Sequence, residues 1–204
     1  MSAKPPPLVC IHGVGGSADE WEPAAQALGE RATVVTEMPA TGRFALAGHS
    51  YGGVQALRFA AERPERVAAL VLTSCFFPPA RGGRSYAAAA WDYARHRASY
   101  VREVAGRRRA PRPSARAAGQ MATMARFGIR PQAFNALADA IRCPALVVHG
   151  DQDHVVPVAF ARAAVATQPA WAYAEIHGAG HFAHRDRAEE WAAIVAPWLV
   201  IESS

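Results

Sequence analysis

Short apolar runs, each bounded by turn residues, recur along the 204-residue chain. Most of these runs are apolar throughout and do not alternate with polar residues, which is typical of strands covered on both faces of a parallel sheet. The pattern predicts six strands, at Leu8 to Ile11, Thr33 to Thr36, Phe44 to Ala47, Val67 to Thr73, Ala145 to His149 and Trp171 to Ile176.

Helical patterns fall between the predicted strands. Residues 17–20, Ser-Ala-Asp-Glu, match a capping box and predict a helix that runs to about Gly29. A second helical stripe of apolar residues follows Gly53, and a third runs from Trp191 to Trp198. Alternating strands and helices predict an α/β fold, with a mostly parallel sheet of about six strands, helices on both faces, and ligands at the carboxyl edge of the sheet.

Residues 78–140 interrupt this alternation, because they are rich in arginine and alanine and contain no strand-like run. We interpret them as a helical insertion within a single domain that spans residues 1–204. Residues 81–130 carry twelve arginines against Asp92 and Glu103, a net charge of +10, while the rest of the chain sums to −5. Arginines 95, 102 and 109 would share one helix face, for which a solvated surface is favoured over an anion-binding surface. Nucleic-acid binding is disfavoured, because the remaining chain is acidic and no binding motif accompanies the arginines.

Composition narrows the class of protein further. Hydrophobic residues make up 51% of the chain and charged residues 19%, which argues against intrinsic disorder and fibrous architectures. No apolar stretch is long enough to span a bilayer and no secretory leader is visible, so we expect a cytoplasmic protein without a membrane partner. The three cysteines, Cys10, Cys75 and Cys143, are far apart and are interpreted as small core residues. No C-x-x-C pair is present to form a cysteine zinc site or a dithiol redox site.

The main candidate for chemistry is the segment Gly48-His49-Ser50-Tyr51-Gly52-Gly53, which follows one predicted strand and opens a predicted helix. A G-x-S-x-G motif in this setting is typical of a nucleophile elbow, in which a strained turn projects the serine hydroxyl. Glycines at positions 48 and 52 allow the strand and the helix to approach closely. Such a match arises by chance in roughly one chain in twenty of this composition, so its context must decide.

Three further motifs follow predicted strands. Residues 12–16, His-Gly-Val-Gly-Gly, can direct a backbone N–H toward a developing oxyanion, with the Tyr51 N–H as its partner. Residues 150–153, Gly-Asp-Gln-Asp, offer a carboxylate, and residues 178–181, Gly-Ala-Gly-His, offer an imidazole. The order along the chain is the one expected with a strand-to-helix serine nucleophile: Ser50, Asp153, His181.

On these four motifs, which span residues 12–182, the chain resembles the α/β-hydrolase superfamily, in particular its small serine esterases with a helical cap. The resemblance implies a serine hydrolase with residues 78–140 as the cap. It also implies the site residues: Ser50 as nucleophile, Asp153 as acid, His181 as base, the Val14 and Tyr51 amides as oxyanion hole, and Trp21 at the edge of the substrate pocket.

Some residues have a second interpretation. Asp151 competes with Asp153 for the role of acid; Asp153 is favoured because the resemblance places the acid there and because Asp151 suits bonding to the backbone of its own turn. A metal site built from the histidines at 177, 181 and 184 is disfavoured, because no carboxylate-rich partner motif accompanies them. Four other histidines are interpreted as structural or as neighbours of the site: His12, His49, His149 and His154.

Two departures from the family pattern concern the sheet. Only seven residues precede the first predicted strand, so the family's N-terminal hairpin is expected to be missing. Only Glu37 to Arg43 separate the second predicted strand from the nucleophile strand, although a crossover normally needs a dozen residues or more. One crossover helix should therefore be absent. The chain then either closes the gap with an extended connection and stays active, pairs its second strand differently, or is a degraded relative that folds poorly. Apolar residues on the uncovered face would then favour a homo-oligomer or aggregation.

The function expected from the sequence is hydrolysis of an ester, thioester or related acyl bond of a small, largely apolar substrate. Acyl transfer, perhydrolysis and carbon–carbon bond cleavage use the same machinery and stay open. A serine at position 50, where some relatives have aspartate, argues against epoxide hydrolase and dehalogenase chemistry. The alternative is a non-catalytic, ligand-binding protein on a degenerate hydrolase fold. Neither class requires a cofactor or a metal.

Overall fold

The computed structural model describes residues 7–78, 115, 118–120, 122–123 and 131–199. Its centre is a six-stranded sheet in which every pairing is parallel, in the order β2-β1-β3-β4-β5-β6. The strands are β1 (Leu8–Ile11), β2 (Val34–Val35), β3 (Phe44–His49), β4 (Val67–Thr73), β5 (Ala145–Gly150) and β6 (Trp171–Ile176). The predicted parallel α/β sheet is confirmed, and the main difference is that β2 is shorter than expected.

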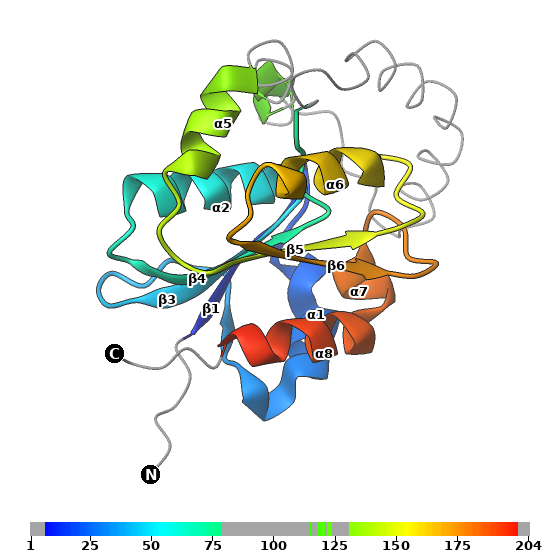
Figure 1. Cartoon of the computed structure of the whole chain (residues 1–204). Helices are drawn as coiled ribbons and strands as arrows, with labels where there is room; N and C mark the ends of the chain where they lie inside the picture. The colour runs from blue at the N-terminus through cyan, green and yellow to red at the C-terminus, as the bar shows by residue number, and fades with distance from the viewer. Residues whose placement is uncertain (1–6, 79–114, 116–117, 121, 124–130, 200–204) are drawn as a thin grey trace.

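Helices cover both faces of this sheet (Figure 1). One face carries α2 (Tyr51–Glu62), α5 (Pro131–Asp139) and α6 (Val158–Ala166). The other face carries α1 (Glu22–Leu28), α7 (Ala183–Asp186) and α8 (Ala188–Leu199). Two 3₁₀ turns, η1 (Ala18–Trp21) and η2 (Gly29–Arg31), flank α1.

The two covered faces explain why the strands are apolar throughout. Successive side chains of a strand point to opposite faces. In β4, Ala69 and Val71 pack into the core beneath α1 and α8. Leu70 and Leu72 pack into the core beneath α2 and α5. Both positions of the two-residue repeat are therefore buried, and the alternation typical of a half-exposed strand is lost.

The predicted capping box at residues 17–20 is wrong. Ser17 precedes the 3₁₀ turn η1, but its side chain makes no capping bond to the helix backbone and instead bonds Asp19 Oδ1. Glu20 is buried, at 8% exposed, and its carboxylate points into the protein interior toward His49. A buried partner for the glutamate has replaced the local bond that the spacing suggested.

The short connection between β2 and β3 crosses over β1 without a helix, as expected from its length. Arg66 holds this connection from outside, because its Nε donates to the Gly42 carbonyl and its Nη2 to the Pro39 carbonyl, both at 2.7 Å. The residues of the connection form bends and no helix, and β2 pairs in parallel with β1, so the chain closes the short gap without a helix, as in the first of the three expected outcomes. Met38 in this connection is 42% exposed, and it is the one large hydrophobic side chain that is exposed among the described residues.

Most of the predicted cap, including arginines 95, 102 and 109, lies outside the described residues. Within residues 78–140, α5 packs on the sheet side: Phe134 is 2% exposed and meets the ring of Phe77 edge-on, at 5.8 Å between centroids. Cys10 and Cys75 are buried as expected, and Cys143 is half-buried. None of the helices in the described part of the chain combines the length and the apolar character needed to cross a membrane.

Candidate active site

Ser50 occupies a sharp turn between β3 and α2. Its backbone angles, φ 53° and ψ −118°, lie in a region that residues with a side chain rarely adopt, which costs about 1 to 3 kcal/mol. Hydrogen bonds from Ser50 N to Thr73 O and from Gly53 N to Ser50 O, both 3.0 Å, hold the turn in place. Such a turn between a strand and a helix is the geometry that the G-x-S-x-G pattern predicted.

The glycines of the motif allow main-chain segments to touch. A Cβ atom on Gly48 would lie 2.4 Å from the Gly52 carbonyl oxygen, and one on Gly52 would lie 2.3 Å from the Ile11 carbonyl oxygen. No side chain fits at either position without displacing backbone. The start of α2 is therefore packed directly against the ends of β1 and β3.

A carboxylate and an imidazole meet at the same edge of the sheet, as Figure 1 shows for the loops after β5 and β6. His181 Nδ1 lies 2.9 Å from Asp153 Oδ2, and both side chains are at most 5% exposed. The other oxygen of Asp153 accepts hydrogen bonds from the N–H groups of Val155 and Val156, each at 2.8 Å. One oxygen of Asp153 is thus held by the backbone of its own turn, and the other oxygen, Oδ2, faces His181.

The electrostatics keep Asp153 ionised. Burial alone raises the pKa of its carboxyl group, but attraction to His181 and hydrogen bonds from His149 and His181 outweigh burial and hold the pKa well below its usual range. His149 Nε2 lies 3.1 Å from Asp153 Oδ2 and also 2.9 Å from the Val156 carbonyl oxygen. An ionised carboxylate at His181 Nδ1 keeps a proton on that nitrogen and leaves Nε2 as the nitrogen that can accept one.

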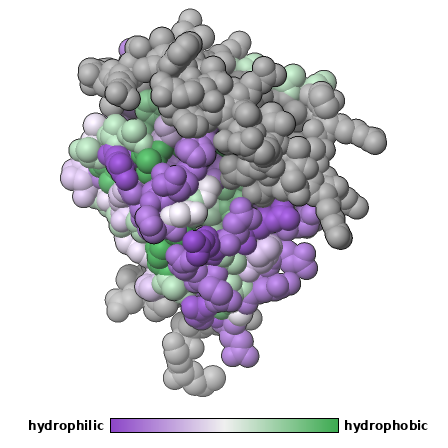
Figure 2. All heavy atoms as spheres, turned by 90° about the vertical axis from the view of Figure 1, so that its right-hand side faces the viewer, coloured by the Kyte–Doolittle hydropathy of each residue, from purple (hydrophilic) through white to green (hydrophobic). Residues whose placement is uncertain are grey.

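The loop of His181 adjoins the serine turn. His49, the residue before Ser50, lies 3.0 Å through its Nε2 from the His181 carbonyl oxygen, and the two imidazole rings are 4.7 Å apart between centroids. The structure therefore brings positions 50, 153 and 181 to one edge of the sheet. Figure 2 views the molecule from the right-hand side of Figure 1, and hydrophilic residues gather on the described part of the surface seen there.

The two expected oxyanion donors lie beside the same turn. Tyr51 is the first residue of α2, where backbone N–H groups have no partner within the helix. Val14 lies in the turn after β1, next to Gly13, where a Cβ atom would contact His49 and Ser50 side-chain atoms at 3.0 to 3.4 Å. The neighbouring Gly15 N–H donates to Gln120 Oε1 at 3.3 Å. Main-chain amides are thus placed next to the serine turn, while their catalytic role stays a prediction.

Asp151 has a different surrounding from Asp153. Its oxygens accept the Gly178 N–H and face His177 Nδ1, both at 2.7 Å, on the exposed side of the loops. Burial raises the pKa of Asp151, but these two partners outweigh it and lower the pKa overall. Asp151 therefore bonds the backbone of the neighbouring loop. The expectation that it would bond the backbone of its own turn was wrong.

Trp21 is 1% exposed and packs against Trp191 and His184, with ring centroids 5.7 and 4.3 Å away. It contributes to the core on the α1 and α8 side of the sheet. Its assignment to the substrate pocket stays a prediction.

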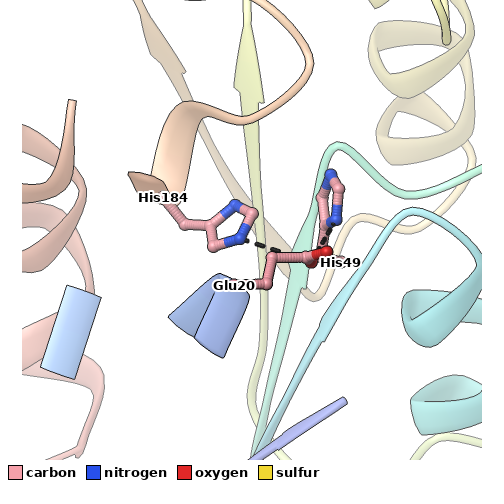
Figure 3. Close-up of side chains that lie close together, drawn as sticks. All are labelled: Glu20, His49 and His184. Carbon is pink, nitrogen blue, oxygen red and sulfur yellow. Dashed lines mark hydrogen bonds and ion pairs between the residues drawn. The ribbon is translucent and has the colours of Figure 1, made fainter. Parts of the chain in front are cut away.

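A buried cluster next to this site was not foreseen. Glu20, His49 and His184 come from η1, β3 and α7, and each offers an atom within 4.8 Å of the others (Figure 3). The sequence pattern places Glu20 in a capping box and suggests His184 as a ligand only together with His177 and His181. No sequence pattern could have predicted that these three residues lie together, because they are far apart along the chain and belong to different elements.

Comparison with known proteins agrees with this architecture. A family model described as "Alpha/beta hydrolase family" matches residues 21–194. The chain belongs to the alpha/beta hydrolase family. Curated relatives of this family member include two proteins named "Putative carbamate hydrolase RutD", from Klebsiella pneumoniae (strain 342) and Klebsiella variicola (strain At-22). Each is 31% identical over 176 residues, which cover 77% of this chain and 66% of the relative. The chain therefore spans just under two thirds of the length of these relatives.

Solved structures of the same fold cover nearly the whole chain. A thermophilic esterase from Thermogutta terrifontis has a TM-score of 0.69 at 23% identity, covering 98% of this chain and 92% of the esterase. A monoacylglycerol lipase from Paleococcus ferrophilus has a TM-score of 0.67 at 18% identity, covering 95% and 93%. A thioesterase domain from the curacin biosynthetic pathway has a TM-score of 0.62 at 17% identity, covering 96% and 92%. At these identities the likeness concerns the fold of the alpha/beta hydrolase.

Proposed function

We propose that this alpha/beta hydrolase cleaves an ester, thioester or related acyl bond of a small, largely apolar substrate through an acyl-enzyme on Ser50. The observation that carries the proposal is the buried pair of His181 and Asp153, 2.9 Å apart, at the sheet edge where Ser50 occupies a strained turn. A serine, an imidazole and a carboxylate in this order and setting form a serine hydrolase triad.

In the proposed reaction, Ser50 Oγ attacks the substrate carbonyl carbon while its proton moves to His181 Nε2. Asp153 holds the proton at His181 Nδ1 and stabilises the imidazolium that forms. The amides of Val14 and Tyr51 donate to the developing oxyanion. The bond to the leaving group then breaks as His181 returns the proton to it. Water attacks the acyl-enzyme by the same route and releases the acid and free Ser50.

The substrate class is proposed from the site and from the named relatives together. The curated relatives are named as carbamate hydrolases, and solved proteins of the same fold include an esterase, a lipase and a thioesterase. All of these names describe attack on an acyl carbon bonded to oxygen, nitrogen or sulfur. An activated acetate ester is accordingly the first substrate to test, with carbamate and thioester analogues next.

A second candidate is a non-catalytic, ligand-binding protein on the same fold. The short connection from β2 to β3 favours it, because the missing helix shows that the chain has lost part of the family's architecture. The retained carboxylate–imidazole pair argues against it. A protein that only binds a ligand would not need an ionised, buried Asp153 next to an imidazole.

The test is labelling with a fluorophosphonate probe, which reacts only with an activated serine. The wild-type protein should be labelled at Ser50, and hydrolysis of p-nitrophenyl acetate should fall about 10⁴- to 10⁶-fold in Ser50→Ala with an unchanged melting temperature. Activity retained in a clean Ser50→Ala preparation would remove the serine from the mechanism. Absence of both labelling and hydrolysis in the folded wild-type protein would favour the ligand-binding alternative.

A further inference from the structure

Three buried residues that the proposed mechanism does not use lie directly behind the serine turn. Glu20 is 8% exposed, His49 is 1% exposed and His184 is fully buried. In Figure 3 the Glu20 carboxylate lies between the two imidazole rings, with one contact to each. Burying a carboxylate beside two imidazoles is costly unless the group is paired, so the cluster requires a physical reason.

The hydrogen bonds of His49 define its protonation. Its Nε2 lies 3.0 Å from the carbonyl oxygen of His181, which can only accept, so Nε2 carries a proton. Its Nδ1 lies 2.6 Å from Glu20 Oε1, so a second proton lies between these two atoms. This second proton belongs either to the imidazole, which is then an imidazolium, or to the glutamate.

The surroundings of Glu20 favour the ionised carboxylate. Burial alone raises the pKa of Glu20, but attraction to His49, the hydrogen bond with His49 and the nearby His184 together outweigh burial and hold the pKa well below its usual range. The Gly13 N–H adds a donor to Glu20 Oε1 at 3.3 Å. An ionised Glu20 can accept both from His49 Nδ1 and from the Gly13 N–H.

His184 remains neutral in this cluster. Burial and the charge of His49 lower the pKa of His184 to about 4. Its Nε2 is 3.5 Å from Glu20 Oε1, too far for a good hydrogen bond. The charged and titratable groups that face His49 in the described chain are thus Glu20, His181 and His184.

The same three residue types could in principle bind a metal, but the spacing favours a proton. Two ligand atoms around a tetrahedral zinc ion, each at about 2.0 to 2.1 Å, are separated by roughly 3.3 Å. The 2.6 Å between His49 Nδ1 and Glu20 Oε1 is shorter than that separation and is a hydrogen-bond length. A metal would have to force this pair apart.

We propose that Glu20 and His49 form a buried carboxylate–imidazolium pair that positions the main chain of His181 and the glycine turn of Gly13. His49 donates to the His181 carbonyl, and Glu20 accepts the Gly13 N–H, so one pair links the loops that carry the proposed base and the proposed oxyanion donor Val14. The part of this inference that concerns catalysis rests on the proposed function. Bonds from a charged donor are the stronger ones, which suits a group that must hold a loop.

The protonation state is tested directly by NMR. In protein labelled with ¹⁵N-histidine at pH 7.5, ring ¹H–¹⁵N correlations should show protons on both nitrogens of His49, assigned by the signals that His49→Gln removes. In Glu20→Gln the charge partner is gone, and His49 should show one protonated nitrogen. A neutral His49 ring in the wild-type protein overturns the proposal.

The positioning role is tested with two matched double variants, in which no buried charge is left unpaired. Glu20→Met/His49→Leu removes the donor to the His181 carbonyl. Glu20→Met/His49→Gln restores an amide donor near the place of Nε2. Since an error of about 1 Å in the placement of a catalytic group costs up to about 100-fold, we expect the leucine variant to lose 10- to 100-fold in kcat for p-nitrophenyl acetate with KM changed less than twofold. The glutamine variant should recover most of this loss.

The outcomes separate the two proposals. Equal kcat in both double variants means that the donor to His181 is dispensable and overturns the positioning role. One equivalent of zinc bound by the wild-type protein and lost in Glu20→Gln also overturns it, in favour of a metal site. If the leucine variant does not fold, the NMR measurement on the wild-type protein and Glu20→Gln still decides whether Glu20 and His49 form a charged pair. If Ser50→Ala keeps full activity, the proposed function fails while the ring spectra still report on the pair.

Discussion

Replacing Asp153 by asparagine tests the candidate site at its most buried point. The two carboxylate oxygens face four donors: the Val155 and Val156 amides at 2.8 Å, His181 Nδ1 at 2.9 Å and His149 Nε2 at 3.1 Å. In Asp153→Asn the amide oxygen can keep the two backbone bonds. The amide NH₂ then faces His181, and because this group only donates, His181 Nδ1 must become an acceptor.

The consequence for catalysis follows from the tautomer of His181. With Nδ1 as an acceptor, the ring proton moves to Nε2, the nitrogen that takes the proton from Ser50 in the proposed mechanism. In serine hydrolase triads this change lowers kcat by about 10⁴-fold, equivalent to about 5 kcal/mol of barrier. The backbone bonds that remain should preserve the fold.

The assay is steady-state hydrolysis of p-nitrophenyl acetate, with Asp151→Asn as the matched control. Asp151 lies two residues away on the same turn, but it is on the exposed side, where its carboxylate bonds the Gly178 N–H and His177. We expect the control to stay within threefold of the wild-type kcat. The reasoning is refuted if folded Asp153→Asn retains more than a tenth of the wild-type kcat, or if both variants lose activity equally.

Three further predictions concern stability. Burial and the charge of His49 lower the pKa of His184 from the usual 6.5 to about 4, so as pH falls the unfolded chain binds this proton before the folded protein does. The free energy of unfolding should therefore fall by about 3 kcal/mol as pH drops from about 6.5 to 4. In urea unfolding measured across this window, His184→Phe should lose correspondingly less stability. Gly48→Ala should cost about 1 to 3 kcal/mol in the same assay, because its Cβ would meet the backbone of α2. Gly119→Ala should be nearly neutral, because among the described residues no atom outside its own chain neighbours and helix backbone lies within 4 Å of the added Cβ. Equal effects of the two substitutions would contradict the packing argument. Arg66→Met should lower the free energy of unfolding by about 1 to 3 kcal/mol, because it frees the connection from β2 to β3. The control Arg63→Met removes an exposed bond to the neighbouring Glu62 carbonyl and should leave the unfolding midpoint unchanged.

Local patterns were sufficient for the architecture because each strand carries its own signal. The β1 and β4 bounds agree with the predicted runs, since a strand buried on both faces is apolar whatever its neighbours are. The β6 bounds agree as well, although β6 is an edge strand and most of its residues are only half-buried. The missing crossover helix could also be predicted, because the length of a connection limits which elements it can contain. The length of β2 was overestimated, because only Val34 and Val35 pair with β1, and the extent of this pairing is not visible in the apolar run itself.

The identity of the candidate site residues was likewise a matter of sequence. Motifs after successive parallel strands end at one edge of the sheet, so Ser50, Asp153 and His181 could be grouped before any coordinates were known. Which aspartate faces the imidazole is a tertiary question: Asp153 and Asp151 share a turn, and only the packing of the loop after β6 turns one toward His181 and the other toward His177.

The buried cluster depended on tertiary structure alone. Glu20 has the spacing of a capping residue, and its local interpretation failed because the carboxylate lies in the interior between His49 and His184 instead of bonding the backbone of its own turn. Hydrogen bonds within one turn are visible in sequence, whereas pairing across 29 residues from Glu20 to His49 has no local period. The sequence by itself therefore determined the sheet, the covered faces and the chemical groups at the sheet edge. Their mutual orientation, and the charges buried behind them, were decided only when the distant elements packed together.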